Sequence, residues 1–230
     1  MSTTSTSIDT PAALGDHTAW PTVWRVAGGL ALAHVVMLFA AITQEVMVSH
    51  DTSLEKLQDS YADANLTRVF TGGYIEAVSF VVLAAAVVVV ARIFRRGSEG
   101  ARLSSDTFLA LGVTFVAATL AVGFAPGAAA MYGAQHGADI HAVAVVNDIR
   151  NYGYQLQVMI QGAMAIALGL AALLGGLMKR WVGWGGIVIG AATLVGTPFA
   201  NNGLGMLWYI WWVGVAVLLL TGRGLEQTRK

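Results

Sequence analysis

The sequence predicts an all-α fold: a polytopic membrane bundle of six transmembrane helices with both termini in the cytoplasm. Of the 230 residues, 56% are hydrophobic and only 11% are charged, and the mean hydropathy is +0.66. Soluble domains contain about 45–50% apolar and about 25% charged residues. A soluble fold of this length could not bury so much apolar surface, so we expect the lipid bilayer to be the main partner.

Six apolar segments each come near the ~20 residues that a helix needs to cross a bilayer core of about 30 Å. Each must be helical, because the backbone polar groups of an open strand would lack hydrogen-bond partners in lipid. The predicted spans are 24–48, 69–94, 107–132, 152–178, 181–200 and 205–222. We expect the fourth helix to begin earlier, near residue 141, and Pro126 to kink or end the third.

Basic residues predict the orientation of these spans. One side of the membrane would carry three, Lys56, Arg68 and Arg150. The other side would carry ten: Arg25, Arg92, Arg95, Arg96, Arg102, Lys179, Arg180, Arg223, Arg229 and Lys230. Short loops rich in Lys and Arg stay in the cytoplasm, so both termini are predicted to be cytoplasmic.

The chain is therefore divided into three parts. Residues 1–23 are polar, contain no Lys or Arg, and are expected to form a disordered cytoplasmic tail. Residues 24–222 form the membrane domain, and residues 223–230 form a short basic cytoplasmic tail.

Charge balance and the absence of cysteine exclude several functions. The 13 basic residues equal the 13 acidic residues, so the net charge is zero and nucleic acid is not an expected partner. The chain has no cysteine, which excludes disulfides, thiolate metal sites and a cysteine nucleophile. We expect no cofactor: His34 is the single histidine inside a predicted span, whereas a haem-binding bundle would use a pair.

Histidines also occur in the acidic loops, as His50, His136 and His141. His136 and His141 are five residues apart, which suits neither one face of a zinc-binding helix nor a short chelating loop. We therefore expect solvated acidic loops and no metal site.

Glycines are concentrated in the fifth span, at positions 183, 185, 186, 190 and 196. Gly186 and Gly190 form a GxxxG step, and small residues at this spacing let two helix backbones approach closely. Packing inside the bundle is the main interpretation. A homodimer through these glycines is the alternative.

Polar residues inside the spans need an explanation, because a charge at the bilayer centre costs about 2.5–3.5 kcal/mol on insertion scales. In the fourth helix, Arg150 is followed at i+4, i+7 and i+11 by Tyr154, Gln157 and Gln161, which places all four on one face. Asn151 belongs to a second stripe beside it. These five residues are candidate ligand-binding residues in the outer half of the bundle.

Three further residues complete the predicted pocket. His34 lies near the membrane midplane and would form its floor, or would simply be a packed histidine. Glu45 is expected to share a helical face with His34, and Glu76 lies about 9 Å below the outer end of the second helix. The two glutamates are the catalytic candidates, because a buried carboxyl is suited to acid/base chemistry. A purely structural role for these polar groups, as interhelical hydrogen bonds, is the alternative.

Short motifs add a resemblance to a known family. They are Arg25-x-x-Gly28, Arg68 at the start of the second helix, Asn151-Tyr152-Gly153-Tyr154, and Arg180 followed by Gly183 and Gly190. Over about residues 24–222 the chain resembles a family of small bacterial integral membrane proteins catalogued only as a domain of unknown function. The resemblance implies a six-helix bundle in a bacterial plasma membrane and no established activity.

Three functions fit these observations. The first is binding or transport of a small amphipathic molecule, whose polar head Arg150 and the glutamines would hold. The second is an intramembrane enzyme in which Glu45 or Glu76 acts as acid or base on a lipophilic, isoprenoid-like substrate. The third is an accessory subunit of a membrane complex, whose polar face contacts partner helices.

Overall fold

The computed structural model describes residues 20–199 and 203–222, and the described residues are helical with no β-strand. A π-helical turn, Leu120–Phe124, joins two of the helices. The α-helices are α1 (Trp20–Ile42), α2 (Leu54–Ala62), α3 (Leu66–Phe94), α4 (Glu99–Thr119), α5 (Ala125–Gln135), α6 (Ile140–Gly175), α7 (Arg180–Gly196) and α8 (Leu204–Thr221). The all-α prediction is confirmed over these residues.

Five helical segments are long and apolar enough to cross a bilayer, which indicates a multi-pass membrane protein. They are Thr22–Ile42, Leu66–Phe94, Glu99–Gln135, Ile140–Gly175 and Leu204–Thr221. The remaining predicted span, 181–200, corresponds to α7, which has only 17 residues. At 1.5 Å per residue it is about 25 Å long, slightly shorter than a bilayer core of about 30 Å.

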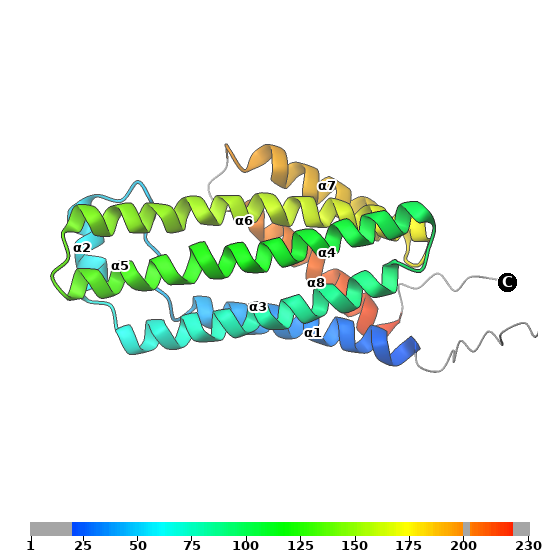
Figure 1. Cartoon of the computed structure of the whole chain (residues 1–230), viewed down its shortest axis with the longest axis horizontal. Helices are drawn as coiled ribbons and strands as arrows, with labels where there is room; N and C mark the ends of the chain where they lie inside the picture. Colours follow the sequence, from blue (N-terminus) through cyan, green and yellow to red (C-terminus); the bar gives the residue numbers. More distant parts are fainter. Residues whose placement is uncertain (1–19, 200–202, 223–230) are drawn as a thin grey trace, which may run out of the picture.

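The helices run up and down one long axis, and α1 begins at the same end of the molecule at which α8 ends (Figure 1). The longest helix, α6, has 36 residues and is about 54 Å long. The hairpin of α7 and α8 covers only part of it, because Gly205 at the start of α8 lies beside Tyr154 and Gln161 of α6. The first 14 residues of α6, about 21 Å of helix, therefore extend past this hairpin.

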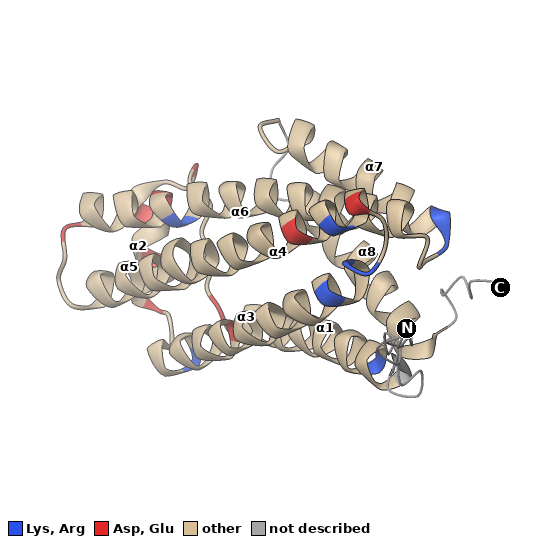
Figure 2. Ribbon diagram, turned by 45° about the vertical axis from the view of Figure 1, so that its right-hand side comes forward, with Lys and Arg blue, Asp and Glu red and all other residues tan. Residues whose placement is uncertain are grey.

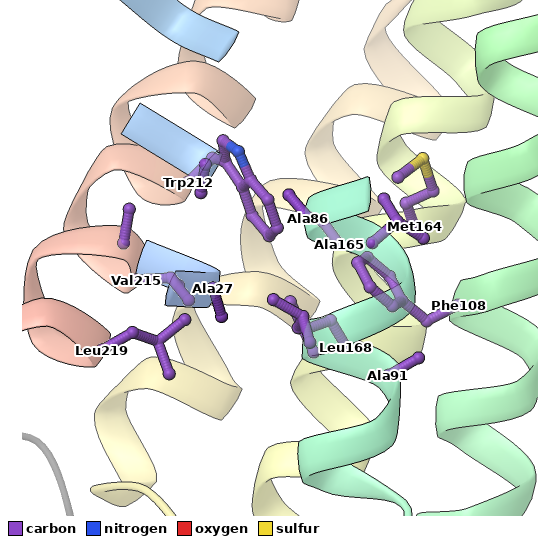
Figure 3. Packing of buried hydrophobic residues seen from close by; sticks show 14 of the residues in the cluster. Ala27, Ala86, Ala91, Phe108, Met164, Ala165, Leu168, Trp212, Val215 and Leu219 are labelled. Atoms are coloured by element: carbon purple, nitrogen blue, oxygen red, sulfur yellow. The ribbon is translucent and has the colours of Figure 1, made fainter. Parts of the chain in front are cut away.

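The molecule thus has two parts along its long axis, and each part has its own apolar cluster. We call the part covered by α7 and α8 the bundle, and its cluster includes Trp24 and Leu219. Figure 3 shows Trp212 and Phe108 among small residues such as Ala86 and Ala165. We call the other part the cap: α2, α5, the segment 43–53 and the start of α6. Its separate cluster comprises Val48, Leu57, Tyr61, Val69, Ala130, Met131 and Val143.

The glycines of α7 pack inside the chain. A side chain at Gly183, Gly186 or Gly190 would collide with α6, against the carbonyl groups of Gly169, Ala165 and Gly162 in turn. The backbones of α6 and α7 therefore approach closely through small residues. This agrees with the prediction that the GxxxG step packs inside the bundle. Association of two copies through α7 stays a prediction.

The end of α1 corrects one prediction. The helix ends at Ile42 and the chain turns through Thr43–Glu45, so Glu45 is not on a helix and does not share a helical face with His34. The carbonyls of the segment that follows accept hydrogen bonds from α3 and α6: Arg68 donates to the Thr43 carbonyl and Arg150 to the Val46 carbonyl. At its other end, α1 begins at Trp20, inside the predicted tail 1–23. Residues 1–19 and 223–230 of the two predicted tails lie outside the described residues.

The third predicted span is longer than expected and does not end at Pro126. It begins at Glu99, where the Ser98 hydroxyl accepts a hydrogen bond from the Ala101 amide at 3.2 Å. It then passes through the π-helical turn into α5, with Pro126 in the first turn of α5. A proline has no N–H for the carbonyl four residues earlier, and the wider turn accommodates this loss.

Two other boundaries concern the cap. The early start of the fourth helix is confirmed, because α6 begins at Ile140 behind an N-cap formed by Asp139. Helix α2 lies where the sequence predicts only a solvated acidic loop. Its N-cap is Ser53, and Leu57 and Tyr61 are its buried residues.

Candidate functional site

Arg150 of α6 forms the centre of a buried polar cluster where the cap meets the bundle. Its Nη2 donates to Glu45 Oε2 at 2.6 Å, and its Nη1 donates to the Val46 carbonyl at 3.1 Å. Only 15% of the Arg150 side chain and 5% of the Glu45 side chain are exposed. The buried pair therefore joins α6 to the segment that follows α1 by charge-assisted hydrogen bonds.

A glycine and a tyrosine lie beside this guanidinium. A Cβ at Gly127 of α5 would lie 2.9 Å from Arg150 Cδ, so only glycine allows the arginine to cross there. Tyr61 of α2 lies on the other side and donates its hydroxyl hydrogen to Asn147 Oδ1 at 2.7 Å. Burial raises the pKa of Tyr61, and the neighbouring Arg150 charge opposes that rise.

Backbone carbonyls of the cap are bound by amide and guanidinium groups. Asn151 Nδ2 donates to the Val48 carbonyl at 3.1 Å, and Arg68 Nη2 donates to the Thr43 carbonyl at 2.9 Å. Gln135 Nε2 donates to the carbonyls of Tyr61 and Ala64 at the end of α2. Asn151 thus lies against the segment 43–53 and does not accompany the glutamines of α6 into the bundle.

A second carboxyl lies at the same place. Glu76 of α3 is beside Glu45 and within electrostatic reach of Arg150. Two carboxyl groups therefore share one arginine. Glu45 Oε2 is bound to the guanidinium, and a side-chain hydrogen bond joins the Glu45 and Glu76 carboxyl groups.

A small cavity adjoins this cluster. Its volume is about 10 Å³, which is room for roughly one water molecule. Glu45 and Arg150 line it together with Phe124, Met131 and Val69. Any ligand larger than water requires one of these side chains to move.

The π-helical turn borders both the cavity and the polar face of α6. Val122 packs on Gly153, a Cβ at Gly123 would lie 3.3 Å from Gln157 Nε2, and the ring of Phe124 covers Gly73 of α3. The Val122–Gly153 and Phe124–Gly73 contacts leave no room for a Cβ at the glycine. Segments of π-helix inside α-helices are frequent at functional sites.

The predicted stripe continues along α6 into the bundle. Gln157 and Gln161 are 6% and 3% exposed. Gln161 hydrogen-bonds the side chain of Tyr209 from α8, and the Tyr154 hydroxyl lies close to the same tyrosine and to Gly205. The buried Gln157 Nε2 has no hydrogen-bond partner among the described residues.

His34 is packed below this stripe. Its Nδ1 lies 3.0 Å from the Ser79 carbonyl of α3, so Nδ1 carries the hydrogen and donates it. The ring packs between Phe80 and Tyr209, with centroid distances of 5.3 and 6.2 Å. His34 Nε2 is then a buried acceptor, and it has no partner among residues 20–199 and 203–222. His34 is therefore hydrogen-bonded as a packed histidine would be at Nδ1, but not at Nε2.

The histidines near the cap lie apart from this site. His136 stacks on Tyr132 with a centroid distance of 3.8 Å, and the His50 ring is 6.1 Å from that of Tyr152. In the described part of the chain, His, Asp and Glu side chains do not gather in groups of three that could hold a metal ion.

Sequence reasoning missed three residues of this site: Phe124, Tyr61 and Tyr209. Tyr209 is a phenol within an apolar helix, so its position alone could have revealed it. Tyr61 follows Leu54 and Leu57 at i+7 and i+4, a helical spacing that could have revealed α2. The π-helical turn that places Phe124 has no comparable sequence signal beyond the nearby proline.

Comparison with protein families gives a match over residues 26–222 to a domain of unknown function, DUF4386. Neither the curated proteins nor the solved structures give a match to this chain. The match covers most of the chain and confirms the kind of family predicted from the short motifs. The chain therefore belongs to the DUF4386 family.

Proposed function

We propose that this member of the DUF4386 family binds a small amphipathic molecule, with the polar head at the buried face of α6 and the apolar part between the helices. The head would contact Gln157, Gln161 and Tyr154, with Tyr209 on the facing helix. His34 would lie at the floor and the Arg150–Glu45 pair at the opposite, cap-side end. Asn151 is left out of this revised set because it holds the cap.

The observation that carries the proposal is the unpartnered amide of Gln157. Leaving a buried polar group without a hydrogen bond costs about 1–3 kcal/mol, so folded proteins rarely leave one without a reason. Gln157 Nε2 is a donor and His34 Nε2 is an acceptor, and both are buried without partners in the described chain. A head group with a hydroxyl or carbonyl oxygen would satisfy the amide.

The π-helical turn supports a route into this site. Phe124 lines the small cavity at Glu45, and its neighbour Gly123 approaches Gln157 on α6. In this proposal, rotation of the Phe124 ring away from Gly73 enlarges the cavity toward that face without moving a helix. Occupation by a ligand would then be coupled to the position of Phe124.

The test is native mass spectrometry of the protein purified in mild detergent. We expect a discrete co-purified molecule on the wild-type protein and its loss from Gln157→Leu. Gln155→Leu is the matched control, since it makes the same change two residues away and off the predicted face. A wild-type protein without a bound molecule, or equal occupancy of both variants, would contradict the proposal.

A second candidate function rests on the adjacent carboxyls of Glu45 and Glu76. In an intramembrane enzyme, one would donate a proton to a lipophilic substrate while the other, paired with Arg150, would accept one. Glu76→Gln would then abolish turnover of the co-purified molecule without releasing it. Unchanged turnover in Glu76→Gln would exclude this role.

We further propose that the bundle crosses the membrane six times, with both chain ends in the cytoplasm of a bacterial cell and the cap outside. Basic residues gather at the end where α1 begins and α8 ends, whereas acidic residues predominate around the cap (Figure 2). This asymmetry is the one that the positive-inside rule expects. Helix α7 would be the sixth span, since a short span is accommodated by local thinning of the bilayer.

Cysteine labelling tests this topology cleanly, because the chain has no cysteine of its own. Asp59 of α2 and Lys179 before α7 are both exposed. A membrane-impermeant maleimide should label Asp59→Cys in intact cells, and Lys179→Cys only after the membrane is opened. The reverse pattern, or labelling of both in intact cells, would contradict six crossings in this orientation.

A further inference from the structure

An apolar groove lies on the surface of the bundle between α4, α6 and α7. Its volume is about 370 Å³, within the range of small-molecule sites. Leu103 and Leu111 of α4 form one wall, and Leu194 of α7 forms the other. The floor is α6, which contributes Ala163, Ile166, Ala167 and Leu170.

The groove follows from the way three helices pack. Helices α4 and α7 each pack on α6, but within the described chain they do not pack on each other. The close contact between α6 and α7 depends on glycines. Between α4 and α7 the groove leaves part of α6 open, including Leu170, which is 38% exposed. From Leu103 to Leu111 the groove extends about 12 Å along α4, at 1.5 Å per residue.

Its position points to a lipid chain. Except for Leu194 of α7, the lining lies inside segments that are apolar enough to cross a bilayer, so a narrow apolar groove there is accessible to acyl chains from the side. One end of the groove lies a single turn from the start of α4. That start packs on the end of α6, where the Ser98 hydroxyl donates to the Leu174 carbonyl at 3.1 Å.

Exposed basic residues lie near this end, together with Glu99 at the start of α4. Arg102, next to Leu103, is exposed, and so are Lys179 and Arg180 in the connection from α6 to α7. The ion pair found nearby joins Arg95 to Asp106 at 3.1 Å and includes none of these three. Figure 2 shows basic residues gathered at this end of the bundle. Each basic group near the membrane surface contributes about 1 kcal/mol to binding an anionic lipid.

We propose that this groove binds one anionic phospholipid, with an acyl chain between Leu103 and Leu194 and the phosphate at Arg102, Lys179 and Arg180. The lipid covers the floor of α6 that α4 and α7 leave open. This site is separate from the polar face of α6 that carries Gln157, so either site can exist without the other.

Native mass spectrometry with added lipids tests the proposal. The purified protein is titrated with phosphatidylglycerol and with phosphatidylcholine of identical chains. We expect one tightly retained phosphatidylglycerol, about fivefold weaker retention in Arg102→Gln, and no preference in the variant that also carries Lys179→Gln and Arg180→Gln. Arg92→Gln, an exposed basic residue of α3 outside the groove, should keep the preference.

Variants that fill the groove test the proposal independently of the charges. Ala167→Phe should abolish retention of phosphatidylglycerol, whereas Ala85→Phe on the exposed side of α3 should retain it. Ala163→Leu, a smaller change, serves if Ala167→Phe does not fold. Equal retention of both lipids by the wild type would overturn the proposal, and so would unchanged retention of phosphatidylglycerol when the groove is filled.

Discussion

The cap and the bundle are held together by different interactions. The bundle is packed by small and aromatic residues, with glycines at the contact of α6 and α7 and Trp208 stacked on Trp212 at 5.3 Å. The cap has a small apolar cluster, and side chains of Arg68, Gln135 and Asn151 bind its backbone carbonyls. In lipid, helices gain no hydrophobic free energy by associating, so van der Waals contacts from close packing stabilise the bundle. In the cap, which extends beyond the α7–α8 hairpin, side-chain hydrogen bonds to non-helical backbone carbonyls hold the chain in place.

Arg150 lies where these two regions meet. It belongs to α6, which runs through both, and it binds Glu45 and the Val46 carbonyl of the segment 43–53. The cap is thus joined to the bundle through one buried ion pair as well as through continuous helices. The difference between the regions predicts that substitutions at this joint, in the bundle and in the cap will have unequal effects.

The largest effect is expected from Arg150→Met. It leaves the Glu45 carboxyl buried without its partner, which costs about 3–5 kcal/mol of unfolding free energy. The additional change Glu45→Gln removes the uncompensated charge and should restore most of the loss. Unfolding in detergent, followed by circular dichroism against denaturant, measures both.

The matched control is Arg95→Met, which breaks the pair with Asp106. Those side chains are 61% and 45% exposed, and exposed pairs contribute about 0–1 kcal/mol. Equal losses in Arg95→Met and Arg150→Met would mean that burial of the Glu45–Arg150 pair has no energetic consequence. The proposed joint would then be wrong.

A smaller effect is expected in the bundle from Gly190→Ala. The new methyl group would collide with the Gly162 carbonyl and separate α6 from α7, and overpacking of this kind costs about 1–3 kcal/mol. Gly214→Ala of α8 is the control, because nothing lies within 4 Å of its added Cβ. There the higher helix propensity of alanine should leave stability unchanged or slightly raised. Thermal unfolding of both variants in one detergent compares them, and equal midpoints would contradict the packing argument.

The bundle was largely predictable from the sequence because long apolar segments in lipid have few alternatives to helix. Two of the predicted spans, 69–94 and 205–222, differ from α3 and α8 by at most three residues at either end. The glycine spacing of α7 likewise identified a packed face. These features depend on local composition and period, which a sequence contains directly.

The cap was not predictable in the same way, because its structure depends on contacts between distant residues. Arg150 and Glu45 are 105 residues apart in the chain, and the carbonyls of Thr43 and Val46 after Ile42 are bound by residues of α3 and α6. Local sequence alone predicts the segment to residue 48 as a continuation of the helix. The stripe of Tyr154, Gln157 and Gln161 followed from helical period, but the facing Tyr209 and Phe124 did not.

The smallest effect is expected from Tyr61→Phe in the cap. It removes the hydroxyl that donates to Asn147 Oδ1 at 2.7 Å, at a cost of about 1 kcal/mol. Hydrogen exchange should accelerate in α2 and not in α8, because the cap has its own apolar cluster. Tyr132→Phe, at a side chain that is half exposed, should change neither. Uniform acceleration across both helices would show that cap and bundle open as one unit.

Alkaline pH separates the two regions without a substitution. Burial raises the pKa of Tyr61, against the opposing charge of Arg150. Above about pH 10 the unfolded chain loses the phenol proton while the folded cap still holds it, so the stability of the cap falls as pH rises. Exchange in α2 should therefore accelerate above pH 10 in the wild type, after correction for the intrinsic rate, and this acceleration should vanish in Tyr61→Phe. If the phenylalanine variant kept the same pH dependence, another group in the cap would be the one that titrates.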